Sequence, residues 1–138
     1  MGLNHKQIGE VADRTGLSPR TIRYYEEVGL VAPATRSHGG FRLYSEVDVA
    51  RLELIKRMKP LDFSLEEMRE LLMALDALES DATGSADREA LLERLAMFRL
   101  AAEEQCVSLR AQLESAEDFA SSLRREIRQQ KRVSVQPR

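Results

Sequence analysis

The spacing of apolar residues predicts helices along most of this chain. Ile8, Val11 and Ala12 recur at helical intervals, and Gly16 follows at a position that would end the first helix. A much longer stripe of apolar and small residues runs from residue 91 to residue 127, at a mean interval of about 3.6 residues, the period of an α-helix. We therefore expect a mainly α-helical protein with one unusually long helix.

A second helix is predicted after a very short connection. Ser18 can cap its N-terminus, and Pro19 suits its first position, where a backbone N–H would have no partner. This helix is expected to end near Gly29. Only Gly16 and Leu17 separate the first helix from its cap, and this tight spacing is typical of a helix-turn-helix.

The next stretch predicts a two-stranded hairpin and two more helices. Pro33 and the pair Gly39-Gly40 flank short extended segments, which favours a hairpin over residues 34–44. Two Ser residues, each followed three positions later by an acidic residue, resemble capping boxes. These pairs, Ser45 with Asp48 and Ser64 with Glu67, predict helices from Ser45 to about Lys59 and over residues 65–79.

The long apolar stripe predicts an association between two chains. Residues 80–86 have the composition of a linker, and no Gly or Pro interrupts residues 87–131. A helix of this length spans roughly 65 Å and exposes an apolar stripe that a head domain of residues 1–79 cannot cover, so a second chain is the expected partner. Residues 132–138 are expected to be a flexible tail. The expected interface residues are Leu91, Leu95, Phe98, Ala102, Cys106, Leu109, Leu113, Ala116, Phe119, Leu123 and Ile127.

The net charge of −2 hides three segments of different sign. Residues 1–60 hold ten Lys or Arg against seven Asp or Glu (+3), residues 61–118 hold five against fifteen (−10), and residues 119–138 hold six against one (+5). A basic N-terminal part is typical of a protein that meets an anion such as nucleic acid. Two long helices would place basic ends against acidic ends only if they run antiparallel, so we expect an antiparallel coiled-coil dimer with its dyad near Leu109.

Composition excludes several other classes of protein. The single cysteine, Cys106, rules out an intrachain disulfide and a cysteine-pair metal motif, and no histidine has partners at metal-ligand spacing. No apolar run is long enough for a membrane helix, and the first residues lack the apolar core of a signal peptide, so we expect a cytoplasmic protein. No phosphate-binding glycine loop and no nucleophile with a nearby base is evident. We expect neither an enzyme nor a bound cofactor.

Three stretches resemble the MerR (mercury-resistance regulator) family of bacterial transcription factors. They are IGEVADRTGLSPRTIRYYEEVGLVAP, GGFRLYSEVDVARLELIKRM and LDFSLEEMRELL, and the likeness covers residues 7–73 almost without gaps. It implies a winged helix-turn-helix head, an antiparallel coiled-coil dimer and control of a promoter whose spacer is too long. Such regulators are taken to twist and bend that DNA so that polymerase engages both promoter elements. The expected partners are therefore promoter DNA, a second copy of the chain and RNA polymerase.

The resemblance also implies roles for individual residues. The second helix is expected to enter the major groove with its N-terminal end, where Arg20, Thr21 and Tyr24 would read bases. Arg20 is the strongest of these, because its guanidinium can grip guanine through two hydrogen bonds. Phosphate contacts, which set register without reading sequence, are expected from Arg23, Tyr25, Arg36, Arg42, Tyr44 and Lys59.

For several other residues, an ordinary structural role is weighed against a functional one. Phe41 and the methionines at positions 58, 68, 73 and 97 are expected in the core. Arg51 is expected to be either an exposed charge on the helix or a DNA contact. Lys56 and Arg57 cluster with Lys59 at the end of the third predicted helix. Cys106 lies on the apolar stripe, where a buried core residue is favoured over a redox sensor.

Three departures from the family pattern limit what can be carried over. Gln7 stands where a Thr helix cap is frequent, and Asp62 replaces a glycine, which is expected to alter the approach of this loop to phosphate. The cysteines of metal-sensing members are missing, so no effector is assigned. The alternative function is a DNA-architectural or recombination accessory protein that uses the same head without an effector.

Overall fold

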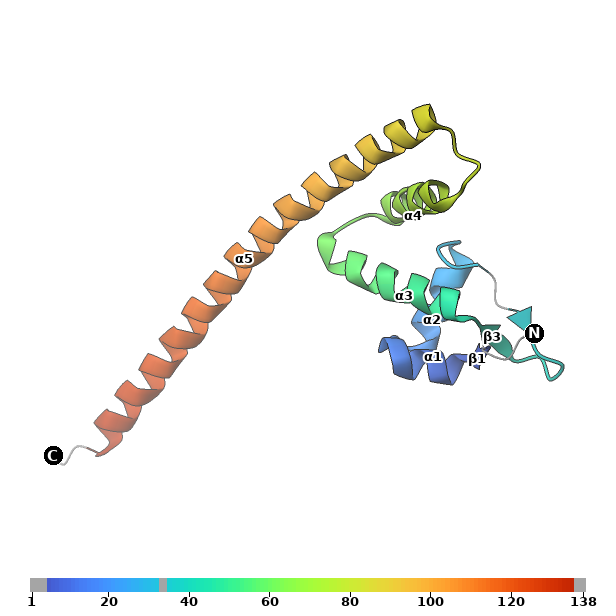
Figure 1. The fold of residues 1–138 in the computed structure, drawn as a ribbon. Coiled ribbons are helices and arrows are strands. Elements are labelled where there is room, and N and C mark those ends of the chain that lie inside the picture. The colour runs from blue at the N-terminus through green and yellow to red at the C-terminus, as the bar shows by residue number, and fades with distance from the viewer. Residues whose placement is uncertain (1–4, 33–34, 136–138) are drawn as a thin grey trace. The chain divides into compact units, whose positions relative to one another are not determined.

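The computed structural model describes residues 5–32 and 35–135, and helices dominate it (Figure 1). The elements are β1 (Lys6–Gln7), α1 (Ile8–Thr15), α2 (Pro19–Glu27), β2 (Thr35–Arg36), β3 (Arg42–Tyr44), α3 (Glu46–Met58), the 3-10 turn η1 (Lys59–Leu61), α4 (Leu65–Glu79) and α5 (Ser85–Val135). The chain divides into two units, Met1–Phe98 and Arg99–Arg138, so the division falls inside α5. The predicted class, a mainly α-helical protein with a winged helix-turn-helix head and a long last helix, is confirmed.

Local signals place the first two helices as expected. Gly16 ends α1 in the left-handed conformation, with φ 75°, and its N–H donates to the Ala12 carbonyl at 2.8 Å. The Ser18 hydroxyl then accepts a hydrogen bond from the Thr21 N–H at 3.1 Å, and Pro19 occupies the first turn of α2. The Gly16 bond thus satisfies a carbonyl near the C-terminus of α1, and the Ser18 bond satisfies an N–H group that α2 itself leaves without a partner.

Both predicted capping boxes are present. At the start of α3 the Asp48 N–H donates to Ser45 Oγ at 3.2 Å, and the Ser45 N–H donates to Asp48 Oδ2 at 2.9 Å. At the start of α4 the same exchange joins Ser64 and Glu67, at 3.1 and 2.8 Å. Four backbone and side-chain groups therefore fix the entry into each helix.

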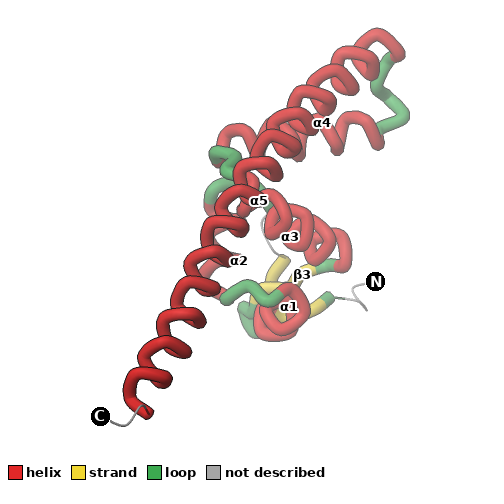
Figure 2. The backbone as a smooth tube through the Cα atoms, turned by 90° about the vertical axis from the view of Figure 1, so that its left-hand side faces the viewer, coloured by secondary structure: helices red, strands yellow, loops and turns green. Residues whose placement is uncertain are grey.

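The sheet has three strands, and the prediction of a two-stranded hairpin missed one of them. All pairs are antiparallel in the order β1-β3-β2, with Lys6 opposite Tyr44 and Thr35 opposite Leu43. Figure 2 shows these short strands in yellow beside α1. The added strand, β1, joins the start of α1 to the centre of the sheet.

The core lies between α1, α2, α3, α4 and the sheet. Val11, Ile22, Leu52 and Ile55 have no exposed surface, and Met58 is also buried, as predicted. Helix α4 adds its buried face to this core. The buried apolar cluster consists of Val11, Ile22, Tyr25, Leu30, Val31, Tyr44, Val49, Leu52, Ile55, Met58, Met68 and Leu72.

Three predicted core residues lie at the surface. Phe41 is 59% exposed because it follows the glycine turn and projects from the hairpin. Met73 on α4 and Met97 on α5 are 65% and 70% exposed. The prediction that these side chains fill the core is therefore wrong for the single chain.

Helix α5 begins at Ser85, two residues earlier than predicted, and the start of its stripe packs within the same chain. Phe98 contacts Phe63 edge to face, with ring centroids 5.8 Å apart, and Arg94 pairs with Glu70 of α4. From Leu109 onward, the stripe residues are exposed in the single chain. In the parts of the chain that the structure describes, no helix combines the length and apolarity needed to cross a bilayer.

Candidate nucleic-acid interface

A cavity of about 460 Å³ opens between α2 and the segment formed by η1 and the start of α4. It gathers five residues that the sequence predicted as contacts: Arg20, Thr21, Tyr24, Tyr25 and Lys59. The other lining residues are Asp62, Phe63, Leu65 and Met68. The surface therefore combines two cationic side chains, three hydroxyl groups, one carboxylate and an apolar floor.

Helix α2 divides into an outer and an inner face, as its sequence requires. Arg20, Arg23 and Tyr24 are exposed, with Tyr24 45% exposed, whereas Ile22 is fully buried. Thr21 is half-buried, and its hydroxyl accepts a hydrogen bond from Ser18 Oγ at 2.9 Å. Helix capping thus orients Thr21 beside the exposed side chains of the same turn.

Tyr25 differs from the other lining residues because its ring belongs to the core. The side chain is only 4% exposed, and its ring lies 5.9 Å from that of Tyr24. It still lines the cavity, but little of its surface is available to a bound molecule. The predicted phosphate contact of Tyr25 stays a prediction.

Tyr44 is a correction to the predicted contacts. It has no exposed surface, and its hydroxyl donates to Glu26 Oε2 at 3.1 Å. Burial raises the pKa of this hydroxyl above its ordinary value, which keeps it a hydrogen-bond donor. A side chain without exposed surface cannot touch a phosphate, so Tyr44 is a structural residue.

Arg42 has a structural contact in addition to its partly exposed surface. Its Nη1 lies 2.6 Å from Glu26 Oε2, and 22% of its side chain is exposed. The guanidinium has further N–H groups beyond this bond. Its predicted phosphate contact therefore stays a prediction.

The hairpin tip is stabilised by its own backbone. Ser37 donates its N–H to the Phe41 carbonyl at 2.9 Å, and Gly40 adopts φ 82°. Arg36 Nη1 donates to the Gly40 carbonyl at 2.8 Å, which places this exposed arginine beside the turn. Phe41 is thus an exposed hairpin residue that sequence reasoning missed, although the preceding glycine pair was a signal for it.

The basic cluster at the end of α3 separates into different roles. Lys56 Nζ donates to the Thr15 carbonyl at 2.7 Å, so it caps the C-terminus of α1. Arg57 and Lys59 are exposed, and of the two only Lys59 lines the cavity beside α2.

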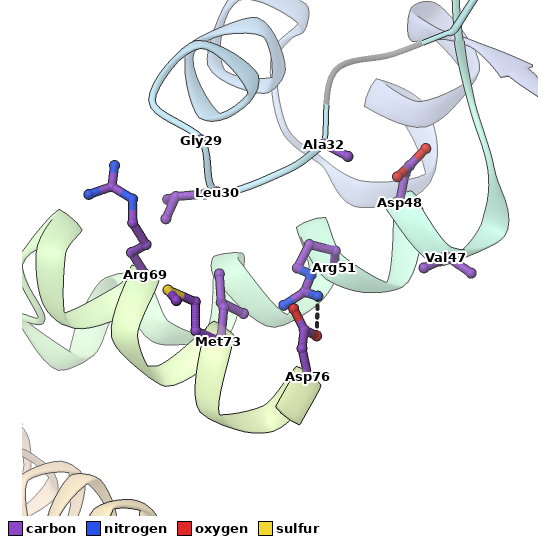
Figure 3. Close-up of a pocket in the computed structure, with 10 residues that line it drawn as sticks. Gly29, Leu30, Ala32, Val47, Asp48, Arg51, Arg69, Met73 and Asp76 are labelled. Carbon is purple, nitrogen blue, oxygen red and sulfur yellow. Dashed lines mark hydrogen bonds and ion pairs between the residues drawn. The ribbon is translucent and has the colours of Figure 1, made fainter. Parts of the chain in front are cut away.

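Arg51 belongs to a second cavity, of about 330 Å³, between α3, α4 and the segment after α2. Figure 3 shows its ion pair with Asp76 of α4, near Met73. Arg69, on the same lining, donates to the Val28 carbonyl. The ion pair joins α3 to α4, and the hydrogen bond joins α4 to the end of α2. These contacts favour a structural role for Arg51 over a DNA contact.

Neither cavity carries a metal-binding constellation. In residues 5–32 and 35–135, no three His, Cys, Asp or Glu side chains come together in a way that could hold an ion. Cys106 is half-buried.

Comparison with known families gives two overlapping matches. Residues 7–75 match the family described as MerR HTH family regulatory protein, and residues 49–136 match the family described as MerR, DNA binding. Together the two matches extend from Gln7 to residue 136, so they include the residues that line the cavity and the whole of α5.

Curated relatives match the head of the chain. The chain is 46% identical over 74 residues to the mercuric resistance operon regulatory protein of Bacillus cereus, covering 54% of this chain and 56% of that protein. It is 48% identical over 66 residues to the transcriptional regulator ZntR of Escherichia coli K12, covering 48% and 47%. The chain thus spans about half the length of these relatives.

Solved structures share the fold over a larger part of the chain. The regulator PbrR691 from Ralstonia metallidurans CH34, in complex with lead(II), is 34% identical, with a TM-score of 0.51 over 87% of this chain and 86% of that one. HiNmlR, a MerR family regulator lacking the sensor domain and bound to promoter DNA, is 21% identical, with a TM-score of 0.60 over 85% and 79%. At that identity the second likeness concerns the fold alone.

Proposed function

Because this chain belongs to the MerR family of helix-turn-helix regulatory proteins, we propose that it regulates transcription by binding promoter DNA as a homodimer. The observation that carries the proposal is the cavity beside α2, where Arg20, Lys59 and three hydroxyl side chains converge. Cations and hydroxyl donors arranged in this way suit the phosphates and base edges of a duplex.

Base reading is assigned to residues 20–24 of α2. Arg20 and Tyr24 are exposed there, and Thr21 lies between them in the same helical turn. A helix that enters the major groove by its N-terminus would bring these three side chains to base edges. Arg20 would supply most of the discrimination between bases, since its guanidinium can donate two hydrogen bonds to guanine O6 and N7.

Phosphate contacts are assigned to cationic and hydroxyl groups around this helix. Arg23 and Arg36 are exposed, and Lys59 lines the cavity from the opposite side to α2. Tyr25 can contribute its hydroxyl edge, and Arg42 its remaining N–H groups. Contacts of this kind fix the register of the protein on the duplex and make binding sensitive to salt.

Dimerisation is assigned to α5. Leu113, Phe119 and Ile127 are each more than half exposed in the single chain, so burying the stripe against a second copy would remove a large apolar area from water. The charge segments favour an antiparallel arrangement of the two helices. A twofold dimer would bind a pseudo-palindromic site.

Control of transcription would then follow from deformation of the DNA. A dimer that holds two reading helices at a fixed separation fits a promoter spacer of different length only if the duplex twists or bends. The cost of this deformation depends on sequence, which gives specificity at positions the protein does not touch. RNA polymerase, at the reshaped promoter, is the proposed partner.

The proposal is tested by selecting bound duplexes from a random DNA pool with the full chain. We expect a pseudo-palindromic sequence and an affinity that falls steeply with salt. Arg20→Ala should relax selection at one base of each half-site by about 1–3 kcal/mol, whereas Lys59→Ala should weaken all sequences alike. Arg125→Ala, at an exposed arginine of α5, makes the same charge change outside the site and should have little effect.

A transcription assay then separates regulation from simple DNA binding. Open-complex formation by polymerase at the selected site, dependent on this protein, would support the proposal. Bending at scattered sequences without a change in transcript would instead support an architectural protein. No salt-dependent binding to any duplex would overturn both.

A further inference from the structure

The cavity beside α2 contains one acidic side chain among its cationic and hydroxyl groups. Arg20 and Lys59 supply positive charge to the lining, and Asp62 supplies the only carboxylate among the described residues there. Asp62 is exposed, and in the described part of the chain its carboxylate has no hydrogen bond or ion pair. An ionised carboxylate left free in this position repels any anion that enters.

The backbone gives no reason for aspartate at this position. Asp62 follows η1 with φ 64° and ψ 27°, and it is the only non-glycine residue with positive φ in residues 5–32 and 35–135. Glycine adopts this left-handed conformation at lower cost, although aspartate tolerates it better than most residues. The carboxylate also makes no bond within the fold, so its negative charge acts on any molecule that enters the cavity.

We propose that Asp62 is an affinity-limiting residue of the DNA-binding surface. This inference rests on the proposed function. The carboxylate opposes the attraction that Arg20 and Lys59 exert on a backbone phosphate, and phosphates are common to every sequence. Asp62 therefore weakens non-specific binding, which is almost wholly electrostatic, and leaves recognition more dependent on base contacts.

Two substitutions separate the charge of Asp62 from its backbone effect. Asp62→Asn keeps the size of the side chain and tolerates the left-handed conformation but removes the charge. Asp62→Gly removes the charge and also the conformational cost. Asp81→Asn is the matched control, because Asp81 is an exposed acid in the turn between α4 and α5 and does not line the cavity.

The measurement is the affinity of the full chain for a short duplex of arbitrary sequence, from about 50 to about 200 mM salt. Both Asp62 variants should bind about tenfold tighter than the parent at the low-salt end, with a gain that shrinks as salt screens the charge. The slope of log affinity against log salt should become steeper by about one for each bound chain. Asp81→Asn should bind like the parent.

The remaining outcomes overturn the proposal in distinguishable ways. If the parent binds but Asp62→Asn binds no tighter, Asp62 does not limit affinity, while the proposed function stands. If only Asp62→Gly gains affinity, the cause is the backbone and not the charge. If the parent binds no duplex at low salt, the proposed function fails and this inference fails with it. Thermal denaturation followed by circular dichroism checks that each variant is folded.

Discussion

Arg42 on β3 and Glu26 on α2 form an ion pair, with Arg42 Nη1 2.6 Å from Glu26 Oε2. The Tyr44 hydroxyl donates to the same carboxylate oxygen at 3.1 Å. Because β3 is the central strand of the sheet, this carboxylate joins the hairpin to the helix that lines the cavity. Glu26 therefore helps to hold the hairpin beside α2.

Replacing Glu26 should destabilise the head more than an ordinary surface substitution would. Glu26→Ala leaves the buried Tyr44 hydroxyl without its acceptor and Arg42 without its ion-pair partner, so we expect a loss of about 2 kcal/mol in the free energy of unfolding. Tyr44→Phe removes only the donor and should cost about 1 kcal/mol. Urea denaturation of both single variants and the double variant measures the coupling. Additive losses would contradict a shared contact.

Helix α1 should be stabilised by a better cap. Gln7 precedes it in an extended conformation, with φ −80° and ψ 161°, but makes no side-chain capping hydrogen bond. Gln7→Thr would supply a hydroxyl for the first turn and a β-branched side chain for β1, so we expect a gain of about 0.5–1 kcal/mol in thermal or urea denaturation. Gln7→Ala is the control, and an equal gain from it would exclude capping as the cause.

Glu46 should make stability depend on pH in the acidic range. Hydrogen bonds from Arg14 and then Lys6 lower its pKa to about 2 from an ordinary value of 4.5. Because the folded pKa lies below the unfolded one, the contribution is complete above pH 4.5 and is lost as the pH falls toward 2. Denaturation midpoints measured between neutral pH and this range should fall less in Glu46→Gln than in the parent. An identical fall in both proteins would assign the effect to other carboxylates.

The proposed dimer should be sensitive to charge at one position of α5. Leu109→Glu would set two carboxylates near the expected dyad, so we expect at least about a tenfold weaker dimer by sedimentation equilibrium. Val107→Glu introduces the same charge two residues away, where the side chain is 63% exposed and lies off the stripe. A Leu109→Glu protein that dimerises like the parent would contradict this interface.

Elements with local signals could be predicted from the sequence. Ser18, Ser45 and Ser64 cap their helices through contacts three residues away, and Gly16 ends α1 through a bond to Ala12. Such contacts depend on neighbours along the chain, so the residue types alone indicate them. The residues of α2 that line the cavity were expected from the resemblance to the MerR family.

Features that depend on distant partners could not be predicted in this way. Strand β1 exists because Gln7 pairs with Leu43, and Lys56 is a helix cap because it reaches Thr15, 41 positions earlier. The resemblance placed Tyr44 among the phosphate contacts, but its hydroxyl donates to Glu26 inside the head. In each case the residue type allowed two environments, and the tertiary fold selected one.

The unequal exposure of the tyrosines gives this molecule a built-in optical reporter. The chain has three tyrosines and no tryptophan, and of the three rings only that of Tyr24 is broadly open to solvent. Quenching of the intrinsic emission by a small solute should therefore act mainly on Tyr24, which lines the cavity beside α2. Any ligand seated there would shield that ring, so its arrival can be followed in unlabelled protein.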